Sequence, residues 1–290
     1  MSTGFTLHMD VEGTAPSDFR LFCAEGDQAK GVNIQNNNSS MTLNYGVGGS
    51  LRLSTSPTGK SGTWTSFRVL GNTLSWTVDL SNVPCGLNAT FYSVVLQNGQ
   101  SYRDACATFP STTELDFMEA NQYAWHTTLH RGKNDCGPAP PIGCGGTISD
   151  PKYHFQDLTH PENKDTAFLY GPGESYVINT LFPFHASLSF ETEADELVAV
   201  GLVLTQGTNS IGQTYTSDNE EYKGWLKGLG NEVKEGCVFV WSLWTGNMSW
   251  LESPPCPKWS SLKCTSTSCQ YTISNISLTP SLSYPPSLIV

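Results

Sequence analysis

The chain consists largely of short runs in which apolar and polar residues alternate, and this pattern restricts the fold more than any other feature. In the first hundred residues the runs read FTLHMD, MTLNYG, SLRLS, WTSFRV, LSWTVDL and TFYSVVL, and turn-forming segments such as GVGG and SPTGKSG separate them. Alternation with a period of two is typical of a half-buried β-strand, and strands recurring roughly every 8 to 12 residues are typical of a β-sandwich. We therefore expect an all-β, antiparallel sandwich.

The second half of the chain continues the same pattern with one interruption by a helix. Further strands are predicted at TAFLYG, SYVINT, FHASLSF, ELVAVGLVL, CVFVWSLW and QYTISNISL. Ser217 to Gly230 has an acid-rich start, apolar residues at helical spacing and a terminal glycine, which predicts one short helix near residues 218–229. The segment from Arg131 to Pro161 is rich in glycine, proline and cysteine, and we expect a long loop held by cystines. Without a repeat or a linker, residues 1–290 are expected to form a single domain.

The charge of the chain argues against some partners. The formal net charge is -11, and affinity for nucleic acid depends on lysine and arginine that neutralise phosphates, so we expect no nucleic acid partner. An acidic surface suits a neutral or cationic substrate, although it is also a common route to solubility. No apolar run is long enough to cross a bilayer, so no membrane partner is expected, and a monomer is the simplest assembly.

The cysteines and the glycosylation sequons indicate an extracellular protein. Nine cysteines lack the paired CxxC spacing of structural zinc sites, so we expect disulfides formed in an oxidising compartment. The odd number leaves at least one thiol free or paired elsewhere. Sequons agree with a secreted glycoprotein; they stand at Asn37, Asn38, Asn88, Asn247 and Asn275. Because no hydrophobic signal segment follows Met1, we expect a mature form with an added initiator methionine.

The run TELDFMEANQYAWHTTLH, from Thr113 to His130, is where we expect the chemistry. It holds Glu114, Asp116 and Glu119 among mostly apolar residues, and an ionised carboxylate is costly to bury without partners. In a regular strand Glu114 and Asp116 share one face while Glu119 points to the other. A β-bulge between Asp116 and Glu119 would add one unpaired residue and bring all three acids to one face.

Two facing carboxylates suit the hydrolysis of a glycosidic bond. In a retaining mechanism, one attacks the anomeric carbon and the other protonates the leaving oxygen, at a separation of about 5 to 5.5 Å. Asp116, between the glutamates, would orient the nucleophile and keep the ionisation states of the two apart. The alternative is a solvated edge strand whose acids only prevent aggregation.

Aromatic and histidine residues add a second functional signal. Trp241 alternates with Phe239 in an apolar strand and is expected in the core, whereas Trp244 and Trp250 lie where the strand becomes a loop and could either stack on sugars or pack inside. His126 and His130 would share a face of a strand, but no third ligand is near, so we expect no metal and no cofactor. A histidine beside the acids would instead position substrate or tune Glu119.

Five segments, in the same order, resemble the glycoside hydrolase family 7 cellulases; they are NVPCGLNATFY, TELDFMEAN, GCGGTISD, FLYGPGESYVINT and VFVWSLWTGNMSWLES. The resemblance implies a curved, concanavalin-like jelly roll and retaining hydrolysis of a β-1,4-linked glucan. It also implies that Glu114 is the nucleophile, Asp116 its assisting carboxylate and Glu119 the general acid/base. Positions implied to bind substrate are Tyr92, Asp104, His130, Trp244 and Trp250.

The chain departs from the family in its loops. The family carries long cystine-tied loops between the positions of Cys85 and Glu114, and here that connection is short, which implies an open cleft and an endo-acting enzyme. The family's Asp-x-Gln element is represented only by Asp104, so the polymer itself is open. The alternatives are a β-1,3 or mixed-linkage glucanase, a chitosanase, a lectin-like binder that has lost turnover, and a polysaccharide lyase.

Overall fold

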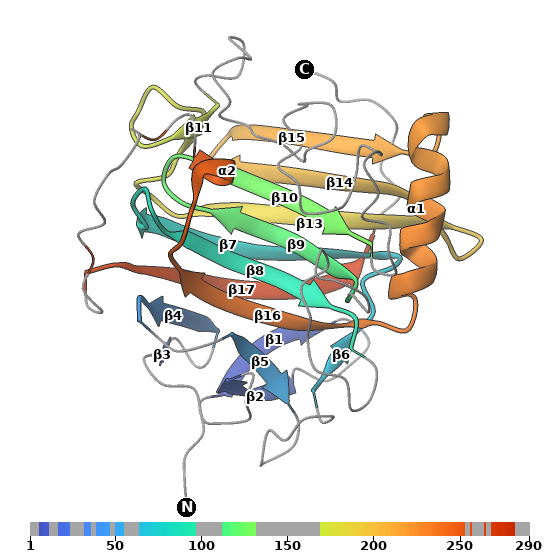
Figure 1. The fold of residues 1–290 in the computed structure, drawn as a ribbon, viewed down its shortest axis with the longest axis horizontal. Coiled ribbons are helices and arrows are strands. Elements are labelled where there is room, and N and C mark those ends of the chain that lie inside the picture. Colours follow the sequence, from blue (N-terminus) through green and yellow to red (C-terminus); the bar gives the residue numbers. More distant parts are fainter. Residues whose placement is uncertain are drawn as a thin grey trace, which may run out of the picture.

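The computed structural model describes residues 6–11, 17–23, 32–35, 39–46, 50–54, 64–96, 112–131, 169–252, 256, 264 and 268–281. Within these residues most of the chain is β-strand, and the strands form two layers that face each other across one core (Figure 1). The predicted loop between Arg131 and Pro161 lies, after Arg131, outside the described residues, as does Asp104.

The first layer, sheet A, has the strand order β10-β9-β8-β16-β5-β2-β1. Its strands are β1 (Thr6–Val11), β2 (Ser17–Cys23), β5 (Leu51–Ser54), β8 (Asn88–Val94), β9 (Glu114–Ala120), β10 (Trp125–His130) and β16 (Cys237–Trp244), with β6 (Ser66–Phe67) beside β16. The strands from β2 to β10 pair antiparallel. Strands β8 and β16 are central, and the β9–β10 hairpin lies at one edge (Figure 1).

The second layer, sheet B, has the order β17-β7-β13-β14-β15, with β4 and then β3 beside β17. Its strands are β3 (Val32–Gln35), β4 (Ser40–Asn44), β7 (Asn72–Asn82), β13 (Phe184–Glu193), β14 (Glu196–Gln206), β15 (Asn209–Thr216) and β17 (Gln270–Pro280). Strand β1 also pairs with β17, in parallel, and the short β11 (Tyr170–Gly171) and β12 (Ile178–Asn179) are a second parallel pair. The antiparallel sandwich that the sequence predicts is therefore present, with these two parallel exceptions.

Large aromatic side chains join the two layers. Trp76 of β7 lies edge-on to Phe91 of β8, with ring centroids 5.2 Å apart, and stacks on Trp125 of β10 at 6.3 Å. Trp241 of β16 stacks on Phe91 at 4.9 Å and is fully buried, which confirms its predicted place in the core. Aromatic contacts of this kind hold strands in one packing arrangement, because the rings fit at only a few angles.

The helix prediction is correct in place but wrong in its boundaries. Helix α1 runs from Glu220 to Val233, and Gly230, predicted as its end, lies inside it. A side chain at Gly230 would begin 2.9 Å from Leu197, so glycine here allows close packing on β14. The turn that follows the helix contains Gly236, at φ +93°, a conformation that glycine adopts without strain. A second helix, α2 (Ser249–Glu252), was not predicted.

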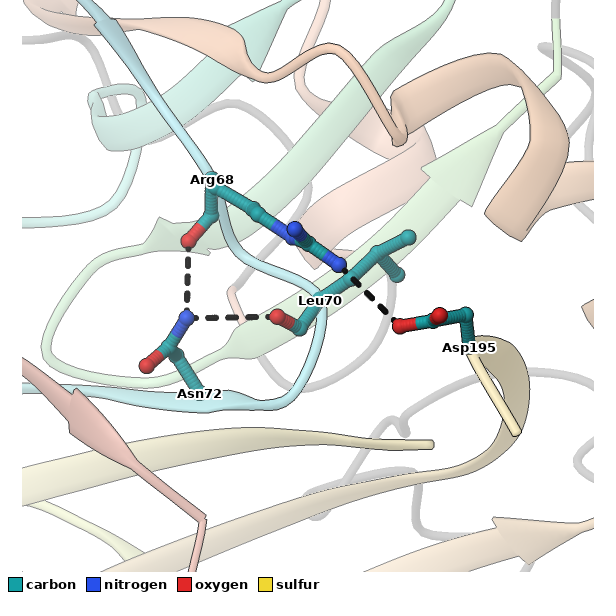
Figure 2. A network of polar contacts seen from close by, with 4 residues as sticks. All are labelled: Arg68, Leu70, Asn72 and Asp195. Carbon is teal, nitrogen blue, oxygen red and sulfur yellow. Dashed lines mark hydrogen bonds and ion pairs between the residues drawn. The ribbon is translucent and has the colours of Figure 1, made fainter. Parts of the chain in front are cut away.

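Local polar contacts link the turn that enters β7 with the turn between β13 and β14. Asn72, the first residue of β7, donates from Nδ2 to the carbonyls of Arg68 and Leu70 at 3.0 and 3.2 Å, and Arg68 reaches Asp195 at 3.5 Å (Figure 2). Asp195 belongs to the two-residue turn between β13 and β14, where it and Ala194 have positive φ. Both φ values are those of the type I′ turn, whose twist matches antiparallel strands.

Two disulfides and a free thiol account for five of the cysteines. Cys85 bonds Cys256 across 171 residues, and Cys264 bonds Cys269. Cys237, at the start of β16, is free and buried. Among the cysteines whose side chains the structure describes, Cys237 is the one with a free thiol, and an odd total of nine requires at least one thiol without a partner in the chain.

Candidate active site

The predicted β-bulge lies in β9 at Phe117 and Met118. Met118 pairs with Phe91 of β8 and Asp116 with Tyr92, so Phe117 is the extra residue against β8. The pairing with β10 shifts at the same place. The Thr127 hydroxyl of β10 donates to the Phe117 carbonyl at 2.8 Å, and this bond replaces part of the interrupted ladder.

The bulge decides which way the acids point. Leu115, Phe117, Met118 and Ala120 are fully buried in the core between the sheets. Because side chains alternate on either side of the bulge, Glu114, Asp116 and Glu119 all lie on the opposite face of sheet A. We call this face, which points away from the core, the outer face. The predicted grouping of the three acids is confirmed.

Each acid of the outer face has a polar neighbour in the flanking strands. Asn88 of β8 donates from Nδ2 to Glu119 Oε1 at 3.0 Å. His130 Nε2 of β10 lies 3.2 Å from Asp116 Oδ2. In the β10 ladder His126 is paired with Glu119 and His130 with Glu114. A histidine thus lies beside the acids, as the residue pattern predicted, and His130 Nε2 contacts Asp116.

Tyr92 and Arg52 form the next part of the outer face. The Tyr92 hydroxyl is hydrogen-bonded to Ser50 at 3.1 Å, and burial raises the pKa of the phenol, with nearby Glu114 and Asp116 adding to the rise. The phenol therefore remains a neutral donor or acceptor beside the acids. Arg52 is 5% exposed, contributes positive potential to Tyr92, and lies 5.5 Å above the ring of Trp64. Sequence reasoning did not single out Arg52, although alternation with the core residues Leu51 and Leu53 could have placed it here.

The two tryptophans lie at one end of this face. Trp244, the last residue of β16, pairs with Asn88 and is 39% exposed, so the core alternative is wrong for it. Trp250, in α2, is partly buried and packs edge-on against His126, with ring centroids 5.8 Å apart. The Cys85–Cys256 disulfide and a bond from Thr245 to the Gly86 carbonyl hold this loop to the start of β8.

Asn88 is a second functional candidate that sequence reasoning missed. The sequence marks it only as a glycosylation sequon, but its side chain is fully buried and bonded to Glu119. Its spacing of four from Tyr92 in one strand was the available signal, because even spacing puts both residues on one face. Among the described residues, no three His, Cys, Asp or Glu side chains are arranged to hold a metal.

Comparison with known proteins gives a consistent result for the fold. The structure aligns with endoglucanase I complexed with cellobiose over 97% of this chain and 98% of that one, with a TM-score of 0.67 and 15% identity. It aligns with a family 7 cellobiohydrolase from Daphnia pulex over 97% of both chains, with a TM-score of 0.66 and 16% identity. The fold is that of the family 7 glycoside hydrolases. The jelly roll implied by the sequence resemblance is thereby confirmed.

Sequence comparison leads to the same family 7 enzymes at low identity. Endoglucanase 1 of Pyricularia oryzae is 23% identical over 256 residues, covering 65% of this chain and 58% of the relative. Endoglucanase EG-1 of Humicola insolens is 25% identical over 255 residues, with 65% and 56% covered. The chain thus spans a little over half the length of these two relatives. No family model matches the chain.

Proposed function

We propose that the protein is a retaining endo-β-1,4-glucanase. The observation that carries the proposal is the bulge in β9, which brings Glu114, Asp116 and Glu119 to one face, with Asn88 bound to the last of them. The similarity to endoglucanases and the family 7 fold support the same conclusion.

The proposed first step forms a glycosyl-enzyme intermediate. A Glu114 carboxylate oxygen attacks the anomeric carbon, and Glu119 gives its proton to the glycosidic oxygen as the bond to the leaving sugar breaks. Glu119 Oε1 accepts a hydrogen bond from the Asn88 amide at 3.0 Å, which restrains the orientation of the carboxyl group that carries the acid proton. Asn88 thereby orients the acid before substrate arrives.

In the second step water replaces the nucleophile. Glu119, now ionised, takes a proton from a water molecule whose oxygen bonds the anomeric carbon, and the ester bond to Glu114 breaks. Asp116, held by His130 at 3.2 Å, sits between the glutamates along the strand and orients Glu114. The two displacements return the original anomeric configuration.

The polymer and the endo mode of attack belong to the proposal. The solved relatives include endoglucanase I complexed with cellobiose and a Melanocarpus albomyces cellobiohydrolase complexed with cellotetraose. A β-linked glucan is therefore the substrate class proposed here, with Trp244 and Trp250 stacking on its sugars and Tyr92 and Asp104 as further contacts. The short loops inferred from the sequence favour an open cleft and attack within the polymer.

A product screen tests the proposal. The purified protein and its Glu119→Gln variant are incubated with soluble cellulose derivatives, mixed-linkage glucan, laminarin, xylan, chitosan and a polyuronate. Reducing ends and the absorbance of unsaturated sugars are both followed. We expect reducing ends from β-1,4-glucan, without the unsaturated chromophore, and their loss in the variant. Release from another polymer would reassign the substrate, and binding without release would identify a lectin-like protein.

We further propose that the protein is a secreted, glycosylated monomer with a single domain. Among the described sequons, Asn247 and Asn275 are exposed and could carry a glycan, whereas the buried Asn88 amide is bonded to Glu119. We expect a eukaryotic secretory host to modify Asn247 or Asn275 and leave Asn88 bare in active protein. Asn37 and Asn38 lie outside the described residues. In the described part of the chain, no helix has the length and apolar character to span a membrane.

A further inference from the structure

A buried carboxylate on helix α1 joins the two ends of the β9–β10 hairpin. Thr113 Oγ1 donates to Glu232 Oε2 at 2.6 Å, and Arg131 donates to Glu232 Oε1 from Nε at 3.3 Å and from Nη2 at 3.2 Å. Thr113 immediately precedes β9 and Arg131 immediately follows β10. In Figure 1 the open end of this hairpin points toward α1.

The residues around Glu232 provide a cation, hydrogen-bond donors and space for this contact. The Glu232 side chain is 8% exposed and that of Arg131 is 24% exposed, and a carboxylate so deeply buried needs a paired cation and hydrogen-bond donors. One turn earlier in α1, Gly228 makes room for the cation, since a side chain there would begin 2.6 Å from both terminal nitrogens of Arg131. Buried Leu226, Leu229 and Val233 anchor the helix itself.

The contact lies one residue from the proposed nucleophile. Glu114 follows Thr113, His130 precedes Arg131, and Glu114 and His130 are paired in the ladder. Since side chains alternate along a strand, Thr113 and Arg131 point away from the outer face while Glu114 and His130 point toward it. Movement of the Thr113 backbone would therefore displace the Glu114 carboxylate directly.

The bulge explains why this end of β9 needs a separate attachment. Beyond the bulge only Asp116, Leu115 and Glu114 pair with β8, and a Val95 to Thr113 backbone bond of 2.9 Å extends the ladder by one step. At the Glu119 end, the Asn121 side chain accepts bonds from the Tyr123 and Ala124 amides. The segments on the two sides of the bulge are thus held by different contacts, and the distance between the glutamates depends on both.

We propose that Glu232 is a positioning residue for the nucleophile. Glu232 lies on α1 and holds the part of β9 that carries Glu114. This fixes the position of Glu114 relative to Glu119, which lies on the other side of the bulge. The inference rests on the proposed role of Glu114. Misplacement of a reacting group by about 1 Å can cost on the order of a hundredfold in rate, so fixing the segment matters for catalysis more than for binding.

The test compares Glu232→Gln with Glu196→Gln. The first substitution keeps the size of the side chain and removes its charge. The second is a matched control, because Lys227 of α1 bonds Glu196 of β14 at 2.6 Å in an exposed pair, with side chains 58% and 55% exposed, that does not reach β9. We measure kcat and KM on soluble β-glucan and amide hydrogen exchange of the peptide covering residues 112–120.

For Glu232→Gln we expect kcat to fall about tenfold to a hundredfold, KM to stay within about twofold, and exchange in β9 to rise. Glu196→Gln should change none of these. Leu229→Val, which loosens α1 without touching the polar contact, separates positioning from stability. An equal fall of kcat in Leu229→Val and Glu232→Gln at matched loss of thermal stability would overturn the proposal.

The two readouts distinguish this inference from the proposed function. If the wild-type protein releases no product from any polymer, the proposed function fails, while hydrogen exchange still decides whether Glu232 holds β9. Unchanged exchange over residues 112–120 in Glu232→Gln overturns the inference whatever the activity. Recovery of most of the lost kcat by Glu232→Asp, which restores the charge for Arg131, would support it.

Discussion

At the scale of single residues, the site depends on small polar groups that set the orientation of the acids. Asn88 is the clearest case, because its amide is fully buried and donates to Glu119. A hydrogen bond to a charged partner contributes about 1.5 to 3 kcal/mol, which corresponds to roughly tenfold to a hundredfold in an equilibrium or a rate. Loss of this one amide can therefore lower the rate nearly as much as loss of a direct contact with the substrate.

Asn88→Ala should lower kcat/KM about tenfold to a hundredfold on substrates with poor leaving groups. The loss should be smaller on aryl glycosides with good leaving groups, because these need less proton donation from Glu119. Steady-state kinetics on the two substrate types measures the difference. Asn88→Asp should be worse than Asn88→Ala, since it places a second carboxylate against Glu119. Equal losses on both leaving groups would argue against a role through the acid.

Glu114→Gln should abolish turnover while folding and oligosaccharide binding stay nearly intact. The amide keeps the shape of the side chain but cannot form the covalent intermediate, so only a transition-state interaction is removed. Circular dichroism and calorimetric titration with a cello-oligosaccharide provide the controls. A variant that retains activity would show that another group is the nucleophile.

Trp244→Ala should weaken oligosaccharide binding by about twofold to tenfold and leave the thermal midpoint almost unchanged, because the ring is 39% exposed. Trp241→Phe, three residues earlier and fully buried, is the matched control and should lower stability without weakening binding. Titration calorimetry and thermal unfolding separate the two effects. Unchanged binding in Trp244→Ala would remove the residue from the substrate site.

At the scale of elements, covalent and helical contacts hold the site from its two ends. Helix α1 reaches the open end of the β9–β10 hairpin through Glu232. The Cys85–Cys256 disulfide ties the segment after α2 to the turn before β8. Both attachments join segments far apart in the sequence. The disulfide restrains the unfolded chain over 171 residues, and Glu232 restrains the open end of the β9–β10 hairpin at the sheet edge.

The double variant Cys85→Ser/Cys256→Ser should lower the free energy of unfolding by about 2 to 5 kcal/mol, because the disulfide spans 171 residues. The Cys264–Cys269 disulfide spans a separation of only 5 residues. Its removal in Cys264→Ser/Cys269→Ser should therefore lower the free energy of unfolding by less. Denaturant unfolding of both double variants gives the comparison. Binding of long oligosaccharides should weaken only in the first, since α2 carries Trp250. A larger loss from the short bridge would contradict this account.

At the scale of the whole molecule, burial of ionisable groups makes the free energy of unfolding vary with pH in the alkaline range. Burial raises the pKa values of Tyr92, Tyr170, Tyr215 and Tyr271 and raises the pKa of Cys237 from 9.0 to about 12. The folded protein thus holds protons that the unfolded chain loses above about pH 9 to 10. Stability is complete below this range and falls as the pH rises.

We expect the free energy of unfolding to fall between pH 9 and pH 11. Cys237→Ala should reduce the slope by up to about 1.4 kcal/mol per pH unit, the contribution of one proton. Urea unfolding at half-unit steps of pH measures both slopes. Peptide mapping after alkylation at pH 8 should find Cys237 unmodified in folded protein. Equal slopes in the two proteins would show that the thiol ionises alike in the folded and unfolded states.

Much of the architecture follows from local pattern, and the exceptions are informative. Short runs rich in apolar residues identified β7, β8, β13, β14, β16 and β17. In β7 and β17 burial alternates with a period of two, because one face of each strand packs against the other sheet, whereas β8 and β16 are buried along almost their whole length. Strands β2, β3 and β15 were not predicted. SDFRLFC ends in adjacent apolar residues that break the period of two, VNIQ is only four residues long, and NSIGQTYT is mostly polar. The end of α1 was misplaced because Gly228 and Gly230 serve close packing there.

The sequence by itself determined the sandwich, the acidic strand and the need for a bulge between Asp116 and Glu119, because alternation of side chains is a property of a single strand. It could not place Asn88 or Glu232 beside that strand, or Arg52 near Tyr92. Those contacts join β8 and α1 to β9, and β5 to Tyr92 of β8, through pairing and packing between segments distant in the chain. Only the tertiary structure decides them, because hydrogen bonds and buried charges find their partners in space and not along the sequence.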